Sequence, residues 1–195
     1  MISKPNESAA TSAPSAPNQA RAKAQGAAVR SRSALAPREH HFRGSLGRYA
    51  TGVAIVTFDG MTKRHGITVN SFTSVSMDPP LVLVSIARST KAHDELAGRP
   101  FAVNILGAEQ RTLAMHFAGR PGPDPLWVEG EVAPRLSNVL AYFECRPWAA
   151  YPGGDHTLYL GEVAHFNYRS GDALAFANST FTTIPQGQRG MEDVL

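Results

Sequence analysis

Residues 151–163 read YPGGDHTLYLGEV, and this stretch combines a turn signal with a strand signal. Its two adjacent glycines permit backbone conformations that other residues avoid, and the run that follows alternates between apolar and polar side chains. The pattern predicts a hairpin turn feeding a long strand, with Asp155 bonded to the turn backbone and His156 half-exposed on the strand. Residues 138–148 (NVLAYFECRPW) predict a second long strand just before the turn.

Outward from this pair of strands, the chain from His40 onward predicts several more strands and three short helices. A continuous apolar run, LVLVSIA over residues 81–87, is expected to be a strand buried on both faces. The helices do not alternate regularly with strands, which favours an antiparallel barrel with helices in its connections over a doubly wound parallel sheet. The helices are expected over residues 40–52, 90–97 and 108–119, and the other strands over 53–58, 65–70, 101–106 and 173–178.

Length and composition indicate one domain with tails. The chain has 195 residues, of which 43% are hydrophobic, enough for one sizeable core. Residues 1–38 are rich in Ala, Ser and Pro and poor in large apolar side chains, so we expect a disordered basic extension, although a transit peptide has a loosely similar composition. The predicted domain covers residues 39–184, and residues 185–195 form a C-terminal tail.

The positive charge of the chain belongs to the extension. The formal net charge is +3, from 19 Lys and Arg against 16 Asp and Glu. The first 39 residues hold six of these bases and two of the acids, hence +4, which leaves −1 for the rest. The predicted domain therefore lacks the basic surface of a nucleic-acid-binding protein.

A single cysteine, Cys145, can form no disulfide framework within the chain and indicates a reducing, cytoplasmic location. The sequence contains no apolar run long enough for a membrane span and no signal-peptide pattern at its start. The spacing of the seven histidines predicts no metal site. Glycine-rich nucleotide motifs and a nucleophile elbow are also absent from the sequence.

Residues 68–76 (TVNSFTSVS) form the densest polar cluster of the chain. One interpretation is an edge strand with a solvated face, which suits its β-branched threonines. The other is a rim of neutral donors and acceptors around a planar heteroaromatic ring, whose polar edge needs hydrogen bonds and whose face needs apolar contact. The pattern by itself favours neither.

Residues 87–96 (ARSTKAHDEL) place two hydroxyls and two cations at a predicted helix start. Free backbone N–H groups and the helix dipole favour an anion there, so the segment could receive a phosphate. The alternative is an ordinary capped helix with basic residues on its surface.

Taken together, these segments resemble the flavin reductase-like domain, the short-chain type that serves as reductase component of two-component flavin monooxygenases. The resemblance covers about residues 40–184 and rests on the following stretches in this order: RYATGVAIVT, GITVNSFTSVSMDPPLVLVSIARST, FAVNILGAEQRTLAMHFAG, LAYFECR and GGDHTLYLGEV. It implies an FMN-binding split β-barrel of the antiparallel, Greek-key type that works as a homodimer. It also implies reduction of FMN or FAD by NADH or NADPH, with the reduced flavin passed to a monooxygenase.

The resemblance also implies roles for particular residues. His156 would position the nicotinamide, and Asp155 would order the turn that carries it. The phosphate of the flavin would lie at residues 88–91. The implied flavin-binding residues are Thr51, Thr68, Val69, Asn70, Ser71, Ser74, Val75, Ser76, Arg88, Ser89, Thr90, Lys91 and Gly154.

Two rival functions remain open from the sequence: a flavin-binding module without enzymatic activity, and a split-barrel oxidoreductase acting on another substrate. Hydride transfer between two cofactors needs no nucleophile from the protein, so the missing catalytic triad does not argue against an enzyme. Neither the choice between FMN and FAD nor that between NADH and NADPH follows from the sequence.

Overall fold

The computed structural model describes residues 37–187. The chain divides into two units, residues 1–40 and 41–195, and the folded elements belong almost entirely to the second. Most of the predicted extension and the last eight residues of the predicted tail lie outside the described residues. Among helices between residues 37 and 187, none has the length and apolarity to cross a membrane.

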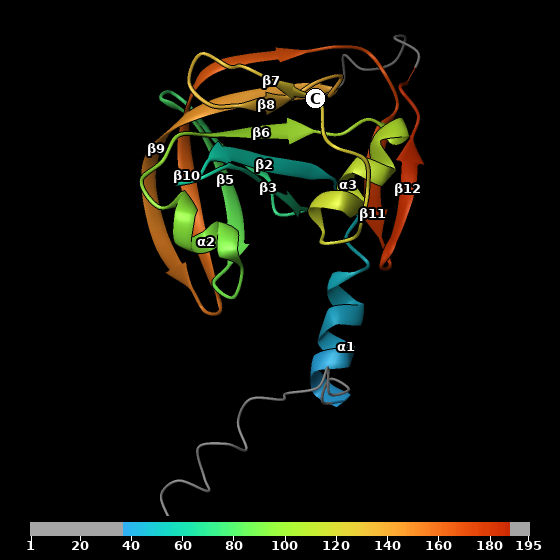
Figure 1. Ribbon diagram of the computed structural model, residues 1–195. Helices are drawn as coiled ribbons and strands as arrows, with labels where there is room; N and C mark the ends of the chain where they lie inside the picture. Colours follow the sequence, from blue (N-terminus) through green and yellow to red (C-terminus); the bar gives the residue numbers. More distant parts are fainter. Residues whose placement is uncertain (1–36, 188–195) are drawn as a thin grey trace, which may run out of the picture. The chain divides into compact units, whose positions relative to one another are not determined.

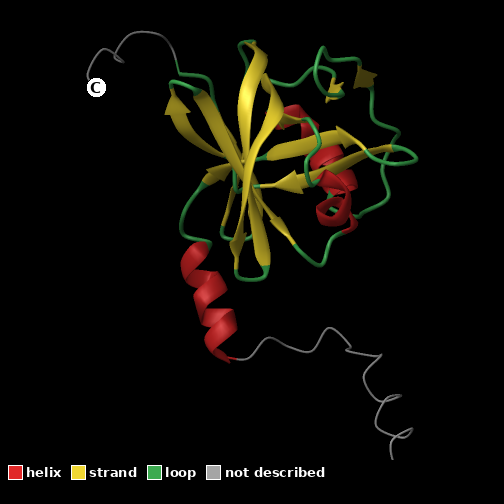
Figure 2. Ribbon diagram, turned by 90° about the vertical axis from the view of Figure 1, so that its left-hand side faces the viewer, coloured by secondary structure: helices red, strands yellow, loops and turns green. Residues whose placement is uncertain are grey.

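A seven-stranded antiparallel sheet forms the main body of the fold, which Figures 1 and 2 show from two sides. Its strand order is β3-β2-β6-β9-β10-β5-β4. The hydrogen-bonded ladders leave β3 and β4 as the two edges, so the sheet does not close into a ring. The predicted antiparallel, mainly β class is confirmed. The strands are β2 (Ala54–Asp59), β3 (Arg64–Val69), β4 (Thr73–Met77), β5 (Pro80–Ala87), β6 (Phe101–Ile105), β9 (Ala141–Gly153) and β10 (His156–Tyr168).

The two longest strands, β9 and β10, form the hairpin that residues 151–163 predict. His156 pairs with Gly153, so only Gly154 and Asp155 connect the strands. Gly154 has a φ of 69°, in the left-handed region that glycine adopts without a steric penalty. The hairpin turn is therefore confirmed. Within the sheet, β5 lies between β10 of this hairpin and the edge strand β4.

Two small sheets complete the fold. One has the order β1-β11-β12, and the other pairs β7 with β8. The sequence analysis missed β12, because its threonines gave it the composition of a polar tail. The bounds are β1 (Thr51–Gly52), β7 (Trp127–Val128), β8 (Arg135–Leu136), β11 (Ala173–Ala177) and β12 (Thr180–Ile184).

Strand β2 is buried on both faces because it separates two hydrophobic clusters. Ala54, Val56 and Phe58 point into the first cluster, together with residues of β5, β6 and β10. Ile55 points the other way, into a second cluster that includes residues of helix α3 and strand β11. The alternation of side chains along a strand accounts for this division. The prediction of two buried faces was made for residues 81–87 of β5, where Val82, Val84 and Ile86 are buried but the alternating residues Leu83 and Ser85 are only half-buried.

Short helices fill the connections, as predicted. Helix α2 (Lys91–Leu96) packs Ala92 and Leu96 into the first cluster, and α3 (Arg111–Phe117) follows the 3-10 turn η1 (Ala108–Gln110). Helix α1 (Pro37–Leu46) differs from the prediction, because it ends at Leu46 and Gly52 lies in β1. Phe42 and Leu46 are exposed, which agrees with the lack of an apolar face along this helix.

Candidate functional site

The ladder between β5 and β10 brings together two segments that lie about 65 residues apart in the sequence. His156 at the start of β10 pairs with Ala87 at the end of β5. Immediately beyond this pair, the backbone N–H of Arg88 donates to the carbonyl oxygen of Asp155 at 2.9 Å. The basic, hydroxyl-bearing segment 88–91 and the Gly-Gly-Asp-His turn are therefore neighbours at one end of the sheet.

Asp155 and His156 form a close pair on this turn. Asp155 Oδ1 lies 2.7 Å from His156 Nδ1, and the two side chains are 93% and 41% exposed. The hydrogen bond and charge of His156 lower the pKa of Asp155, and the charge of Arg43 adds to this effect. Because an ionised carboxylate can only accept, Nδ1 carries the proton. His156 Nε2 then points away from the pair and makes no hydrogen bond within residues 37–187.

At the neighbouring segment, Thr90 caps helix α2. Its hydroxyl donates to Ala87 O at 2.8 Å and accepts from His93 N at 3.3 Å, so this side chain is committed to the cap. Arg88, Ser89 and Lys91 are exposed. Since α2 has only six residues, its dipole is small, and the two cations and the Ser89 hydroxyl would be the main groups attracting a phosphate.

A cavity of about 740 Å³ lies beside the loop between β3 and β4. It is within the size range of small-molecule sites. Thr51 lines it, and the buried Oγ1 of Thr51 has no hydrogen-bond partner among the described residues. Asn70 and Thr73 add polar groups, while Phe72 and Phe143 stack with ring centroids 5.4 Å apart. A planar ring with polar edges fits this lining.

Other residues of the predicted rim have different environments. The Ser71 hydroxyl accepts from Ser85 N and donates to Ser85 O, so it lines the cavity while joining β5 to the 70–72 loop. Thr68 donates to Ala114 O at 2.7 Å and holds α3 against β3, and Val69 is buried in the first cluster. The structure does not bring Thr68 or Val69 into the cavity lining.

Strand β4 carries the remaining rim residues at the edge of the sheet. Ser74 and Val75 are exposed, and Ser76 is half-buried with its hydroxyl accepting from Asp78 N. A register shift between Ser74 and Ser76 marks a bulge at Val75, which changes the direction of the neighbouring side chains. Residues 73–76 thus belong to an edge strand, while residues 70–73 line the cavity.

The cavity and the 88–91 segment are linked along β5. Ser71 touches Ser85, which lies three residues before Arg88. Three residues of extended strand cover about 10 Å. A ligand that carries a phosphate about 10 Å from a flat ring would reach both places.

The sequence analysis did not identify the apolar walls of the cavity. Phe72 lies inside the polar cluster, and Phe143 comes from β9, about 70 residues later. Leu46, Tyr49 and Ile105 also line the cavity. Alternation along the predicted strands could have marked Phe143 as inward-facing, but nothing local to its sequence indicates a binding site.

Residues 46–185 match the family model described as the flavin reductase like domain. This range covers most of the chain and every element from β1 to β12. The chain belongs to this family. The earlier resemblance is therefore confirmed at the level of the whole domain.

The chain is similar to named flavin reductases of other organisms. It is 43% identical to the FMN reductase (NADH) SmoA of Agrobacterium fabrum over 72% of this chain and 83% of that protein. It is 37% identical to the reductase component of 4-hydroxyphenylacetate 3-monooxygenase of Thermus thermophilus, over 63% of this chain and 80% of that protein. A solved Streptomyces globisporus NADH:FAD oxidoreductase, in complex with NAD and FAD fragments, is similar with a TM-score of 0.69 and 35% identity over 83% and 99% of the chains.

Proposed function

We propose that this chain binds flavin in the cavity beside residues 70–72, reduces it with hydride from NADH, and supplies the reduced flavin to a separate monooxygenase. The chain is an NAD(P)H-dependent flavin reductase of its family. The flavin, when bound, supplies the chemistry of hydride acceptance. The observation that carries the proposal is the β5–β10 ladder, which places the basic segment 88–91 beside the Asp155–His156 turn.

In this proposal the cavity holds the ring of the flavin. The unpartnered Thr51 hydroxyl and the side chains of Asn70 and Thr73 supply hydrogen bonds to its polar edge. Phe72 and Phe143 supply an apolar wall that excludes water. Arg88, Ser89 and Lys91 attract the phosphate by charge and hydrogen bonding.

His156 is proposed to orient the nicotinamide nucleotide through Nε2, the ring nitrogen that Asp155 leaves available. Asp155 fixes the ring by accepting from Nδ1. Neither residue needs to transfer a proton for hydride to move. Their contribution is to hold the donor at reacting distance, which is a large part of catalysis by proximity.

We also propose a homodimer located in the cytoplasm. Leu46 and Tyr49 line the cavity and are 59% and 77% exposed, so a second copy would cover apolar surface at the cavity mouth. Light scattering of the full chain tests this directly, since a monomer at all concentrations would refute it. A named monooxygenase component among the relatives supports a transient monooxygenase partner.

The activity is tested by mixing the full chain with NADH or NADPH and with excess FMN or FAD, and following absorbance of the reduced nicotinamide. Oxidation that scales with added flavin supports the reductase. A protein that binds flavin but oxidises neither nucleotide would support the rival binding module.

The role of His156 is tested with His156→Ala, which we expect to raise KM for NADH several-fold with little change in flavin affinity. His165→Leu is a matched control, because His165 lies farther along β10 and pairs with Glu131. Unchanged NADH kinetics in the His156 variant would remove this role.

The phosphate segment is tested with the double variant Ser89→Ala and Lys91→Ala. Loss of these groups should weaken FMN binding by about 1–3 kcal/mol in a fluorescence titration. Lys63→Ala, an exposed lysine of the β2–β3 turn, is the control. An FMN affinity equal to that of the control would remove the assignment.

A further inference from the structure

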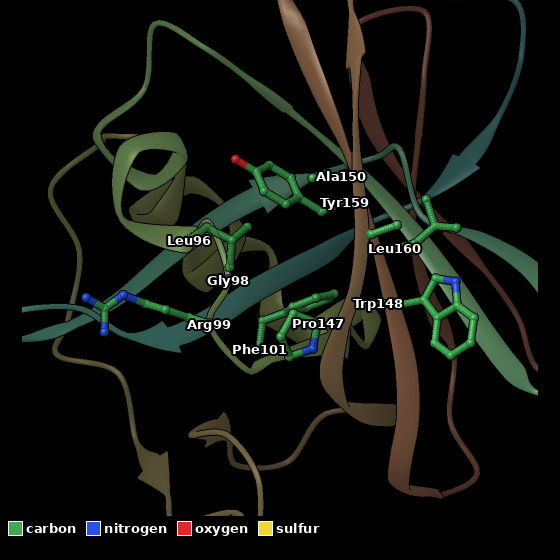
Figure 3. A pocket seen from close by; sticks show the side chains of 10 residues that line it. Leu96, Gly98, Arg99, Phe101, Pro147, Trp148, Ala150, Tyr159 and Leu160 are labelled. Carbon is green, nitrogen blue, oxygen red and sulfur yellow. The ribbon is translucent and has the colours of Figure 1, made fainter.

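Helix α2 begins at Lys91 in the proposed phosphate segment and contacts β10 next to His156 of the proposed nicotinamide turn. Little apolar packing fixes the position of this helix. It has six residues and buries only Ala92 and Leu96. Beside its C-terminal end lies a cavity of about 220 Å³, bounded by Leu96, Phe101 and Tyr159 (Figure 3). A helix this short has almost no stability of its own, so other contacts must hold it in place.

His93 supplies these contacts on the β10 side. Its Nε2 lies 2.9 Å from Thr157 Oγ1, and its Nδ1 lies 3.1 Å from Asp94 Oδ1. The imidazole meets the ring of Tyr159 edge-on at 6.1 Å, and the Tyr159 hydroxyl donates to His93 O at 3.2 Å. Within residues 37–187, these are the only side-chain hydrogen bonds from α2 to β10.

The contact with Thr157 holds in either protonation state of His93. Asp94 accepts from Nδ1–H, so in the neutral ring Nε2 accepts the hydroxyl proton of Thr157. In the charged ring, Nε2–H donates to the same oxygen. The link between α2 and β10 therefore needs no particular charge on the imidazole.

The position of this link in the sequence gives it a functional meaning. Thr157 directly follows His156, and His93 lies two residues after Lys91. We propose that His93 is a positioning residue, which holds the phosphate segment and the nicotinamide-binding turn at a fixed separation. The inference rests on the proposed function and adds a residue that contacts neither cofactor in the proposed arrangement.

Glu95 ties the same helix in another direction, through His65 Nε2 at 3.3 Å and Met61 N at 2.9 Å. The backbone bond from Arg88 to Asp155 remains whatever residue stands at position 93. Removal of the imidazole should therefore leave α2 folded while the helix can shift relative to β10. Flavin would still bind to residues 88–91. Its phosphate and ring would, however, be displaced from the turn that binds NADH.

The experiment compares His93→Leu, Thr157→Val and the double variant with the wild-type enzyme. Leucine keeps apolar bulk against Tyr159, and valine has the shape of threonine without the hydroxyl. We expect each single variant to raise KM for NADH about 5- to 10-fold, as for loss of one half-buried hydrogen bond. The double variant should be no worse than either single, because both remove the same contact. The Kd for flavin without NADH should stay within twofold.

His93→Gln provides the rescue, because its amide can reach Thr157, and its KM for NADH should return to near the wild-type value. His165→Leu controls for loss of a histidine elsewhere on β10. A lower Tm with unchanged KM, or equal rises in KM for NADH and Kd for flavin, would overturn the inference. If His156→Ala also leaves KM for NADH unchanged, the proposed nicotinamide site itself fails, and the role of His93 fails with it.

Discussion

The buried carboxylate of Glu144 should be the most sensitive charged group for stability. It lies on β9 and is 2% exposed. One oxygen accepts from Val132 N at 2.8 Å and Ala133 N at 3.4 Å, and the other lies 3.2 Å from Arg135 Nε. Arg135 also stacks on Tyr142, with its guanidinium carbon 4.2 Å from the ring centre. This carboxylate therefore fixes the loop that leads into β8.

Truncation by Glu144→Ala removes all of these interactions at once. Breaking a buried ion pair from one side costs about 3–5 kcal/mol. Arg135 is 25% exposed and regains some hydration, so we expect the lower end, about 3 kcal/mol. Glu144→Gln keeps an acceptor for the backbone N–H groups and loses only the charge, which should cost about 1–2 kcal/mol.

Urea unfolding followed by tryptophan fluorescence measures these changes as shifts in the free energy of unfolding. For a domain of this size, 3 kcal/mol corresponds to a fall in Tm of about 6–12 °C. Glu131→Ala is the control, since that carboxylate is 79% exposed and its removal should change stability by less than about 0.5 kcal/mol. A loss below about 1 kcal/mol for Glu144→Ala would show that Arg135 and the loop are held by other contacts.

Three further predictions concern single residues. Burial raises the pKa of Cys145 to about 12, so its thiol should resist Ellman's reagent until unfolding. The contribution of this thiol to the free energy of unfolding is fully present below its unfolded pKa near 9. As the pH rises toward 12, that contribution falls by up to about 1.4 kcal/mol per pH unit, because only the unfolded state loses the proton. Urea unfolding of wild type and Cys145→Ala at alkaline pH measures this difference. Gly161→Ala should cost about 1–3 kcal/mol in urea, because its Cβ would lie 2.6 Å from both Phe101 Cζ and Cys145 Cβ, and no loss would mean that Phe101 moves freely. Gly154→Ala should lower the free energy of unfolding by about 1–2 kcal/mol, because residue 154 has a left-handed backbone, and it should raise KM for NADH. A KM equal to that of the wild type would show that nicotinamide binding does not depend on the shape of this turn.

Local sequence patterns predicted the pieces of the site better than their assembly. The turn at Gly154 and the cap at Thr90 follow from the chemistry of a few adjacent residues, and the structure contains both. The pairing of His156 with Ala87 depends on strand order across the whole sheet, which short patterns do not encode. Only the structure or the family resemblance therefore indicates that the Gly-Gly-Asp-His turn lies next to the segment 88–91.

The errors have physical reasons of the same kind. Thr182 and Thr183 made β12 resemble a polar tail, since an exposed strand of a small sheet needs few apolar residues. Thr68 was expected at the rim with its neighbours, but side chains alternate along β3 and its hydroxyl faces α3. Phe143 reaches the cavity from β9, far along the chain, and stacks there on Phe72, a contact that local patterns do not encode.

The seam of the open sheet has a further consequence. Strands β3 and β4 are its two edges, yet only residues 70–72 separate them in the chain. The two edges are thus joined covalently at one end, where the cavity lies, and carry no ladder between them along their length. A sheet joined in this way can widen at its far end while its near end keeps a constant width. The cavity at the near end therefore keeps its lining residues together while the far ends of β3 and β4 move apart, and none of the hydrogen-bonded strand pairs has to break.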